Sequence, residues 1–240
     1  MLNVRMDFEL DVRGDLDRIQ RSLSRLERSQ VPFATAVAMT RTAQDVQAAE
    51  TRLLRQRLDR PAPFTVKSVR VRPARKRDLR AWIWIRDEAT KGTAPVKYLA
   101  PLIYGQRRHA KRYELALQRA GVLPRGWYTV PGEDARLNRY GNITAAMITK
   151  ILSDIRASPD PLQNRSNKRA RFFVMVKAGR PLGIYERTGK RRIKSWLHFV
   201  SGAPDYSKQL PFHRTADRVT RKRFLPRFRR ELAKAIKTAK

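Results

Sequence analysis

Ala81-Trp82-Ile83-Trp84-Ile85 is the segment of the 240-residue chain that most restricts its architecture. All of its side chains are apolar, whereas a strand with one face in water alternates apolar and polar residues. A second run, residues 64–71, is rich in Val and Thr, and the basic segment 74–78 separates the two runs. The pattern predicts a β-hairpin whose second strand is covered on both faces, by helices or by another subunit, and it favours oligomerisation.

Three further strands are predicted late in the chain, at residues 171–176, 183–187 and 196–200. The early and the late strand groups are each too small to be stable alone. We therefore expect them to join in one mixed or antiparallel sheet, packed by long helices, in a single α+β domain covering residues 31–240. Residues 157–170 are polar and rich in Pro, Asn and Ser, and we expect a flexible loop there.

An N-terminal helical extension, residues 1–30, is predicted to precede this domain. Apolar residues spaced three, four and three apart form a narrow stripe on a helix that starts near Asp15. Charged residues flank the stripe, which suits an amphipathic helix laid on a partner. The predicted oligomer or partner interface consists of Leu16, Ile19, Leu23 and Leu26.

A long second helix is expected to follow Pro32, because the fixed φ of proline suits the first turn of a helix. Pro61 and Pro63 should end it. A shorter helix is predicted over residues 109–120, with Gly121 as a left-handed residue just beyond its end.

Two more helices are expected in the second half of the chain. Residues 143–156 follow Asn142, a residue type that favours the N-cap position. Residues 214–238 form a final basic helix that Pro226 should kink or restart. Its predicted apolar face consists of Leu225, Phe228, Leu232 and Ile236.

Basic residues dominate the composition. The chain has 54 Lys and Arg against 21 Asp and Glu, a net charge of +33, and almost all of the excess lies after residue 60. Such a field attracts polyanions, and both DNA and acidic protein neighbours fit it. The clusters predicted to contact them comprise Arg107, Arg108, Lys111, Arg112, Lys190, Arg191, Arg192, Arg221, Lys222, Arg223, Arg229 and Arg230.

Catalytic motifs are not evident in the sequence. The absence of Cys excludes disulfides, thiolate zinc sites and Cys nucleophiles. His109, His198 and His213 have no metal-ligand spacing, and no phosphate-binding glycine motif is present. His109 and Arg112 match a fragment of the tyrosine recombinase signature, which carries little information in so arginine-rich a chain. We therefore expect a protein that is not an enzyme and uses no metal or cofactor.

Membrane insertion and export are not predicted either. The longest apolar run, residues 31–39, is far shorter than the roughly 20 residues that cross a bilayer. Asp7 lies where a signal peptide would have its apolar core. We expect a soluble protein that the standard routes do not export.

Five segments in series resemble the phage minor tail protein Z family, the tail-completion proteins of long-tailed phages and prophages. The resemblance covers roughly residues 31–237, in order and without a large gap. No single segment is specific, whereas the series is. The segments are residues 58–74 (LDRPAPFTVKSVRVRPA), residues 91–105 (KGTAPVKYLAPLIYG) with the basic helix after them, residues 121–124, 130–132 and 140–142 together, residues 183–187 (GIYER), and residues 224–228 (FLPRF).

The resemblance implies a structural virion protein that completes the head-proximal end of the tail at the head–tail junction. It implies assembly in the host cytoplasm into a homo-oligomeric ring, with terminator, tail-tube and head-joining proteins as partners and DNA retained or passed nearby. It carries over no catalytic residue. A sequence-independent DNA-binding protein acting off the particle is the alternative that the charge alone supports.

Overall fold

The computed structural model describes residues 7–9, 25–90, 92–165, 170–203 and 205–238 of the chain. Helices and antiparallel sheets make up its regular structure, which confirms the α+β class. The chain divides into two compact units, one formed by Met1–Gly105 with Ser207–Lys240 and the other by Gln106–Tyr206. Each unit has its own sheet, so the expectation that both strand groups join in one sheet is wrong. Each strand group instead gains a strand that the sequence pattern does not reveal, and thereby reaches a stable size.

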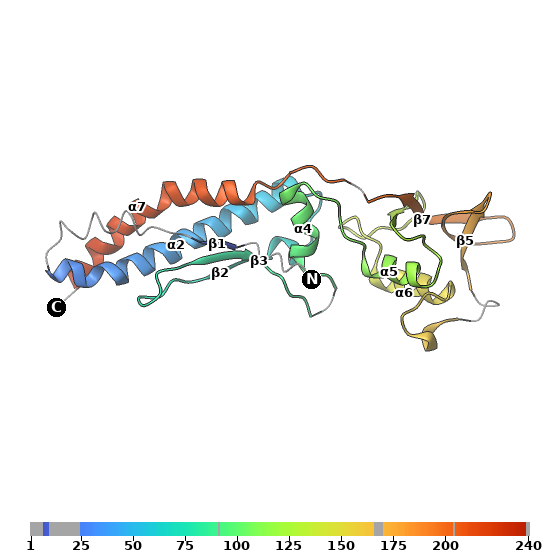
Figure 1. Ribbon diagram of the computed structural model, residues 1–240, viewed down its shortest axis with the longest axis horizontal. Coiled ribbons are helices and arrows are strands. Elements are labelled where there is room, and N and C mark those ends of the chain that lie inside the picture. The colour runs from blue at the N-terminus through green and yellow to red at the C-terminus, as the bar shows by residue number, and fades with distance from the viewer. Residues whose placement is uncertain (1–6, 10–24, 91, 166–169, 204, 239–240) are drawn as a thin grey trace. The chain divides into compact units, whose positions relative to one another are not determined.

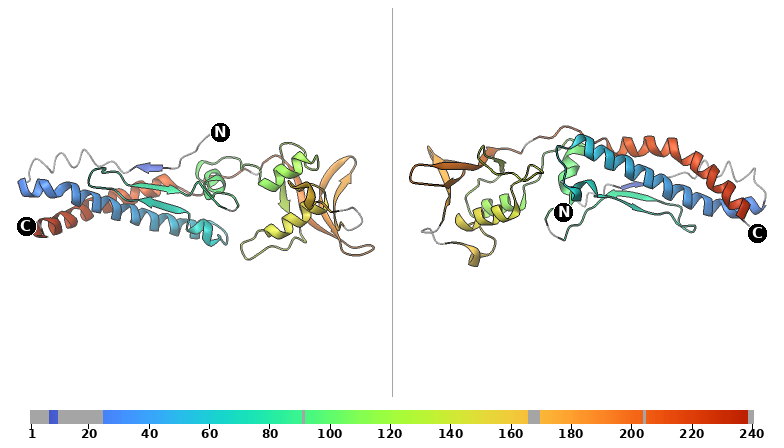
Figure 2. Two further views of the ribbon diagram at one scale, coloured as in Figure 1. Left: turned by 90° about the horizontal axis from the view of Figure 1, so that it is seen from below. Right: turned by 180° about the vertical axis from the view of Figure 1, so that it is seen from behind.

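Two long helices dominate the first unit. α2 (Arg25–Arg57) and α7 (Phe212–Thr238) lie side by side in both ribbon views (Figures 1 and 2). Buried positions recur about every four residues along each helix, so that each buried stripe winds slowly around its helix axis. On α7 these positions are Phe212, Ala216, Phe224, Phe228 and Leu232, and on α2 they include Val31, Thr35, Met39, Ala43, Val46 and Leu54.

The start of α2 differs from the prediction. Pro32 lies inside the helix, which begins at Arg25, and not in its first turn. A proline at such a position costs about 3 kcal/mol, which the burial of Val31, Ala34 and Thr35 around it offsets. The predicted boundary at residue 30 therefore falls within a helix. Of the predicted interface residues, Leu26 belongs to α2, while Leu16, Ile19 and Leu23 lie outside the described residues.

α7 also departs from the prediction. It is one helix across Pro226, although Figure 1 shows its axis changing direction along its length. Leu225 was expected on the apolar face but is 36% exposed, whereas its neighbour Phe224 is 5% exposed. The buried residues of α7 recur about every four positions, and this spacing includes Phe224 and Phe228 but not Leu225.

The sheet of the first unit has the strand order β1-β3-β2, with β1 (Asp7–Glu9), β2 (Val69–Arg72) and β3 (Trp82–Ile85) all antiparallel. The predicted pairing of the two early runs is therefore confirmed. The start of the first run is not a strand, because Pro63 opens the short helix α3 (Pro63–Val66). Ile83 and Ile85 are buried and Trp82 and Trp84 are half-buried, so that the two faces of β3 differ.

α4 (Pro95–Tyr104) completes the first unit and was not predicted. It ends at Gly105, whose φ of 70° is left-handed. The chain returns to this unit at Ser207, and the Leu210 N–H then donates to the Leu102 carbonyl.

The second unit is a four-stranded antiparallel sheet in the order β4-β7-β6-β5, with two helices on one face (Figure 2). The predicted strands correspond to β5 (Phe172–Lys177), β6 (Arg180–Arg187) and β7 (Ile193–Ser201), and β4 (Trp127–Pro131) was missed. The helices α5 (Arg112–Arg119) and α6 (Ala145–Asp154) are both shorter than predicted. Its core includes Leu117, Leu123, Ile151, Phe172, Ile184, Trp196 and Leu197.

One local expectation for this unit is wrong and another is confirmed. The N-cap of α6 is Thr144, whose hydroxyl accepts the Met147 N–H, and Asn142 instead belongs to the preceding turn. Within the expected flexible loop, residues 157–165 contain the 3-10 helix η1 (Pro161–Gln163), and Ala157 is buried whereas residues 159–163 are exposed. Residues 166–169 lie outside the described residues. Gly121 has the predicted left-handed φ, 71°.

Candidate interaction surfaces

The predicted basic clusters fall into three groups with different surroundings. Lys190, Arg191 and Arg192 are exposed in the turn between β6 and β7, which the hydrogen bond from Thr188 N–H to the Arg192 carbonyl closes. None of the three forms an ion pair with a described residue. Their charges therefore remain available to a partner.

Along α7, three consecutive cations are exposed at the same level of the helix. Arg221 pairs with Asp217 one turn earlier at 2.9 Å, and this pair is solvent-exposed. Lys222 and Arg223 pair with no described residue. Three adjacent residues span more than half a helical turn, so this level of α7 is exposed over most of its circumference.

Arg229 and Arg230, the last two predicted cations on α7, differ in their contacts. Arg229 is exposed and pairs with no described residue. Arg230 contacts Glu231 at 3.1 Å, and Glu231 also accepts a 2.6 Å hydrogen bond from Arg41 on α2. Glu231 is buried, so Arg230 contributes to the packing of α7 as well as to its surface.

The group at residues 107–112 is not one surface cluster. Arg107 pairs with Asp205 at 3.0 Å with both side chains largely exposed, and Lys111 and Arg112 are exposed. The Arg108 side chain is only 11% exposed and forms two 2.7 Å hydrogen bonds with Glu114, which is fully buried. Arg108 was predicted to contact a partner, whereas its charge is already neutralised inside the unit.

Glu114 is the centre of a buried polar network between α5 and β4. Its carboxylate accepts hydrogen bonds from the Lys111 backbone N–H at 2.6 Å and from the Thr129 N–H and hydroxyl at 2.8 Å each. Tyr113 hydrogen bonds to the Thr129 hydroxyl at 2.7 Å. Burial alone would raise the pKa of Glu114, but Arg108 and these donors outweigh it and lower the pKa below its ordinary value. The network holds a charged pair in place and leaves neither carboxylate oxygen free for chemistry.

A second buried carboxyl lies in the first unit without such partners. Glu50 on α2 is 1% exposed, and its Oε1 has no hydrogen-bond partner. Burial raises its pKa to about 8, against the opposing influence of Arg218. The side chain is thus neutral over much of the physiological range. The adjacent surface of α2 has an open groove of about 330 Å³, lined by Gln44, Gln47, Ala48, Thr51, Arg52 and Arg55.

Several exposed cations were not singled out from the sequence. Arg214 extends the basic surface at the start of α7, and Lys177 and Arg180 flank the turn between β5 and β6. Arg214 could have been found from the sequence, because it is the first residue of the predicted basic helix. Lys177 and Arg180 become neighbours only when the hairpin forms.

Within the described residues, no three His, Asp or Glu side chains gather in a way that could hold a metal ion. The described helices do not include one that is both long and apolar enough to span a membrane. Comparisons of the chain with protein-family models, with curated proteins and with solved structures found no match.

Proposed function

We propose that the chain is a structural virion protein of a long-tailed phage that completes the head-proximal end of the tail. It acts by binding neighbours in a homo-oligomeric ring at the head–tail junction, where terminator, tail-tube and head-joining proteins and the phage DNA are the partners. The observation that carries the proposal is the ordered series of segments that resemble the minor tail protein Z family across both units.

The glycines of these segments occupy positions that other residues would fill poorly, which supports treating the segments as a pattern and not as coincidence. Gly105 ends α4 in a left-handed conformation, and a Cβ there would lie 3.0 Å from the Lys208 side chain. Gly141 also has a left-handed φ, 73°. A Cβ at Gly183 would overlap the Leu197 carbonyl oxygen. Each glycine therefore has a backbone reason for its place.

The exposed cations support a binding role in a crowded, acidic environment. The turn at residues 190–192 and, on α7, Lys222 and Arg223 present cations that no described carboxylate neutralises. Such surfaces contact phosphates or acidic protein faces through long-range attraction. A neck protein next to packaged DNA would meet both.

The proposal is tested with tagged protein in purified phage particles. We expect the tag to co-purify with intact particles and immunogold labels to lie at the junction of head and tail. Absence from purified particles would contradict the proposal.

The alternative, a sequence-independent DNA-binding protein that acts off the particle, is favoured by the unpaired cations alone. Titration of a duplex at two salt concentrations tests it. Binding through these cations must weaken steeply with salt, and an affinity that ignores salt, or no binding, rules this alternative out.

A further inference from the structure

The sheet of the second unit has a face that α5 and α6 do not cover, here called the outer face. Side chains alternate across a strand, so Phe172, Ile184 and Leu197, which lie in the core with the helices, place their neighbours Phe173, Tyr185 and His198 on the opposite side. These three residues are only half-buried. The outer face therefore carries aromatic rings that the described residues leave partly open.

The three rings come from three adjacent strands and form a continuous row. The centroids of Phe173 on β5 and Tyr185 on β6 are 6.3 Å apart, with 34° between the ring planes. The centroids of Tyr185 and His198 on β7 are 6.1 Å apart, but these rings meet edge to face at 76°. The Phe173 and Tyr185 rings are thus only moderately inclined to each other, whereas the His198 ring is nearly perpendicular to that of Tyr185.

The next cross-strand row of the outer face contains a glycine, which has no side chain. Met175 on β5 pairs with Gly183 on β6, which pairs in turn with His198 on β7. A side chain at Gly183 would collide with the Leu197 backbone, so this position stays bare between Met175 and His198. Gly183 is buried, so the neighbouring side chains of the outer face cover its backbone.

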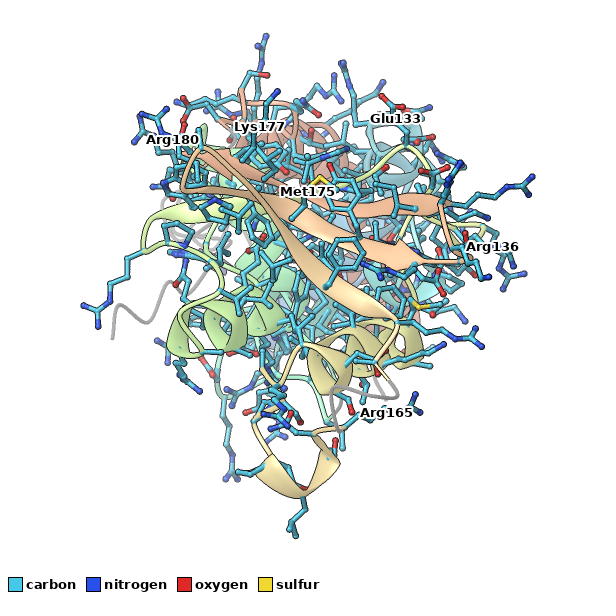
Figure 3. All side chains as sticks on the ribbon, turned by 90° about the vertical axis from the view of Figure 1, so that its right-hand side faces the viewer. Glu133, Arg136, Arg165, Met175, Lys177 and Arg180 are labelled. Carbon is cyan, nitrogen blue, oxygen red and sulfur yellow. The ribbon has the colours of Figure 1, made fainter. Side chains whose placement is uncertain are left out.

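Cations surround the rings. The Arg187 guanidinium lies 5.4 Å from the centroid of Phe173, and exposed Arg171 is adjacent to it along the sheet. Lys177 and Arg180 lie at the other end of β5 and β6, and Figure 3 shows them at the edge of the face on which Met175 lies. None of these cations forms an ion pair with a described residue. Two acidic side chains lie close to this group, and both already have hydrogen-bond partners. Glu186, between Tyr185 and Arg187 on β6, accepts a hydrogen bond from the indole of the core residue Trp196, and Asp134 accepts hydrogen bonds from Ser195, the β7 partner of Tyr185.

We propose that the outer face binds single-stranded nucleic acid, with bases stacked on Phe173, Tyr185 and His198 and phosphates paired with Arg171, Arg187, Lys177 and Arg180. Aromatic rings offer stacking surfaces to any unpaired base, and the surrounding cations attract the backbone that joins the bases. In a duplex the base faces are already stacked, so the rings have nothing to bind. An acidic peptide would use the cations but gain little from the row of rings. This inference goes beyond the proposed function and does not depend on it.

The test is fluorescence anisotropy of the full chain with a labelled single-stranded oligonucleotide of about 20 nucleotides and with the matching duplex. Tyr185→Ala is expected to weaken single-strand binding about tenfold, because one stacking platform is lost, and to change duplex affinity less than about twofold. Tyr185→Leu, which keeps apolar volume without an aromatic ring, should give the same result if the fold is intact by circular dichroism. Phe33→Ala is the matched control, because Phe33 is a 50% exposed aromatic residue on α2 in the other unit.

Three outcomes would overturn the inference. The first is that the wild-type chain shows no measurable binding of the single strand at low salt. The second is that Tyr185→Leu loses single-strand and duplex affinity equally. The third is that this variant loses polyglutamate binding as strongly as it loses oligonucleotide binding. The last would identify the outer face as a docking site for an acidic protein segment. Absence of the protein from phage particles would leave the binding result unchanged, so the two proposals fail separately.

Discussion

Asp45 on α2 and Arg227 on α7 are 182 positions apart in the chain and form two hydrogen bonds of 2.7 Å each. One helical turn away on each helix, Arg41 pairs with Glu231. Moving four residues back on α2 thus corresponds to moving four residues forward on α7, which fixes the antiparallel register of the two helices. Both side chains of the first pair are about three-quarters buried, so that water screens them less than a surface pair.

This pair should contribute measurably to stability. We expect Asp45→Asn to lower the free energy of unfolding by about 1–2 kcal/mol, since it leaves a partly buried guanidinium without its bidentate partner. Asp217→Asn is the matched control, because its pair with Arg221 is exposed and should contribute less than about 1 kcal/mol. Urea denaturation at neutral pH measures both. Equal losses in the two variants would contradict the argument that burial strengthens the pair of Asp45 and Arg227.

The buried pair of Arg108 and Glu114 should matter more. Glu114→Gln leaves a buried guanidinium uncompensated, and such changes cost about 3–5 kcal/mol. We expect hydrogen exchange of residues 127–131 to become much faster while that of residues 82–85 in the other unit stays unchanged. Asp205→Asn, which breaks the exposed pair with Arg107, should leave both segments as they are. Uniformly faster exchange in both units would show that the two units unfold together.

Glu50 should make stability depend on pH. Its folded-state pKa of about 8 lies above the ordinary glutamate pKa of 4.5, so between these values the folded chain holds a proton that the unfolded chain releases. The contribution is complete below pH 4.5 and is lost as the pH rises to about 8, by at most about 1.4 kcal/mol per pH unit. Glu50→Gln should therefore stabilise the chain more at pH 8 than at pH 5, and exposed Glu88→Gln should not. If Glu50→Gln changed the free energy of unfolding equally at pH 5 and pH 8, Glu50 would be charged in the folded chain.

The exposed cations of α7 should contribute to polyanion binding without supporting the fold. Lys222→Glu with Arg223→Glu is expected to weaken duplex binding severalfold at low salt and to leave the melting temperature unchanged, because neither residue has a described partner. Arg230→Glu is a poor choice, since Arg230 contacts the buried Glu231. A large drop in melting temperature in the double variant would identify these residues as structural.

β3 offers a test of the central strand. Ile83 is fully buried, so Ile83→Asp should prevent folding of the first unit, because it buries an unpaired charge. Trp84 on the other face of the strand is half-buried, and Trp84→Asp should destabilise the unit less. Circular dichroism and gel filtration of the two variants decide this. Folding of Ile83→Asp at wild-type yield would contradict the assignment of β3 to the core.

The local patterns of the sequence predicted much of the regular structure. The antiparallel pairing of the early runs, the three late strands, the two long helices and the left-handed Gly121 all follow from the spacing of apolar residues and from the backbone preferences of Gly and Pro. Local signals failed where packing outweighs them. Pro32 is inside α2 because buried neighbours surround it, and Thr144 caps α6 in place of Asn142.

Composition and periodicity by themselves determined the α+β class, the positions of most helices and strands and the excess of positive charge. Only the tertiary structure decided that the strands form two sheets, that Arg108 is neutralised by Glu114, and that Phe173, Tyr185 and His198 lie in one row. The physical reason is the distance along the chain over which each kind of interaction acts. Periodicity reports which side of an element avoids water, whereas the partner of a strand edge or of a buried charge is set by residues far away in the chain.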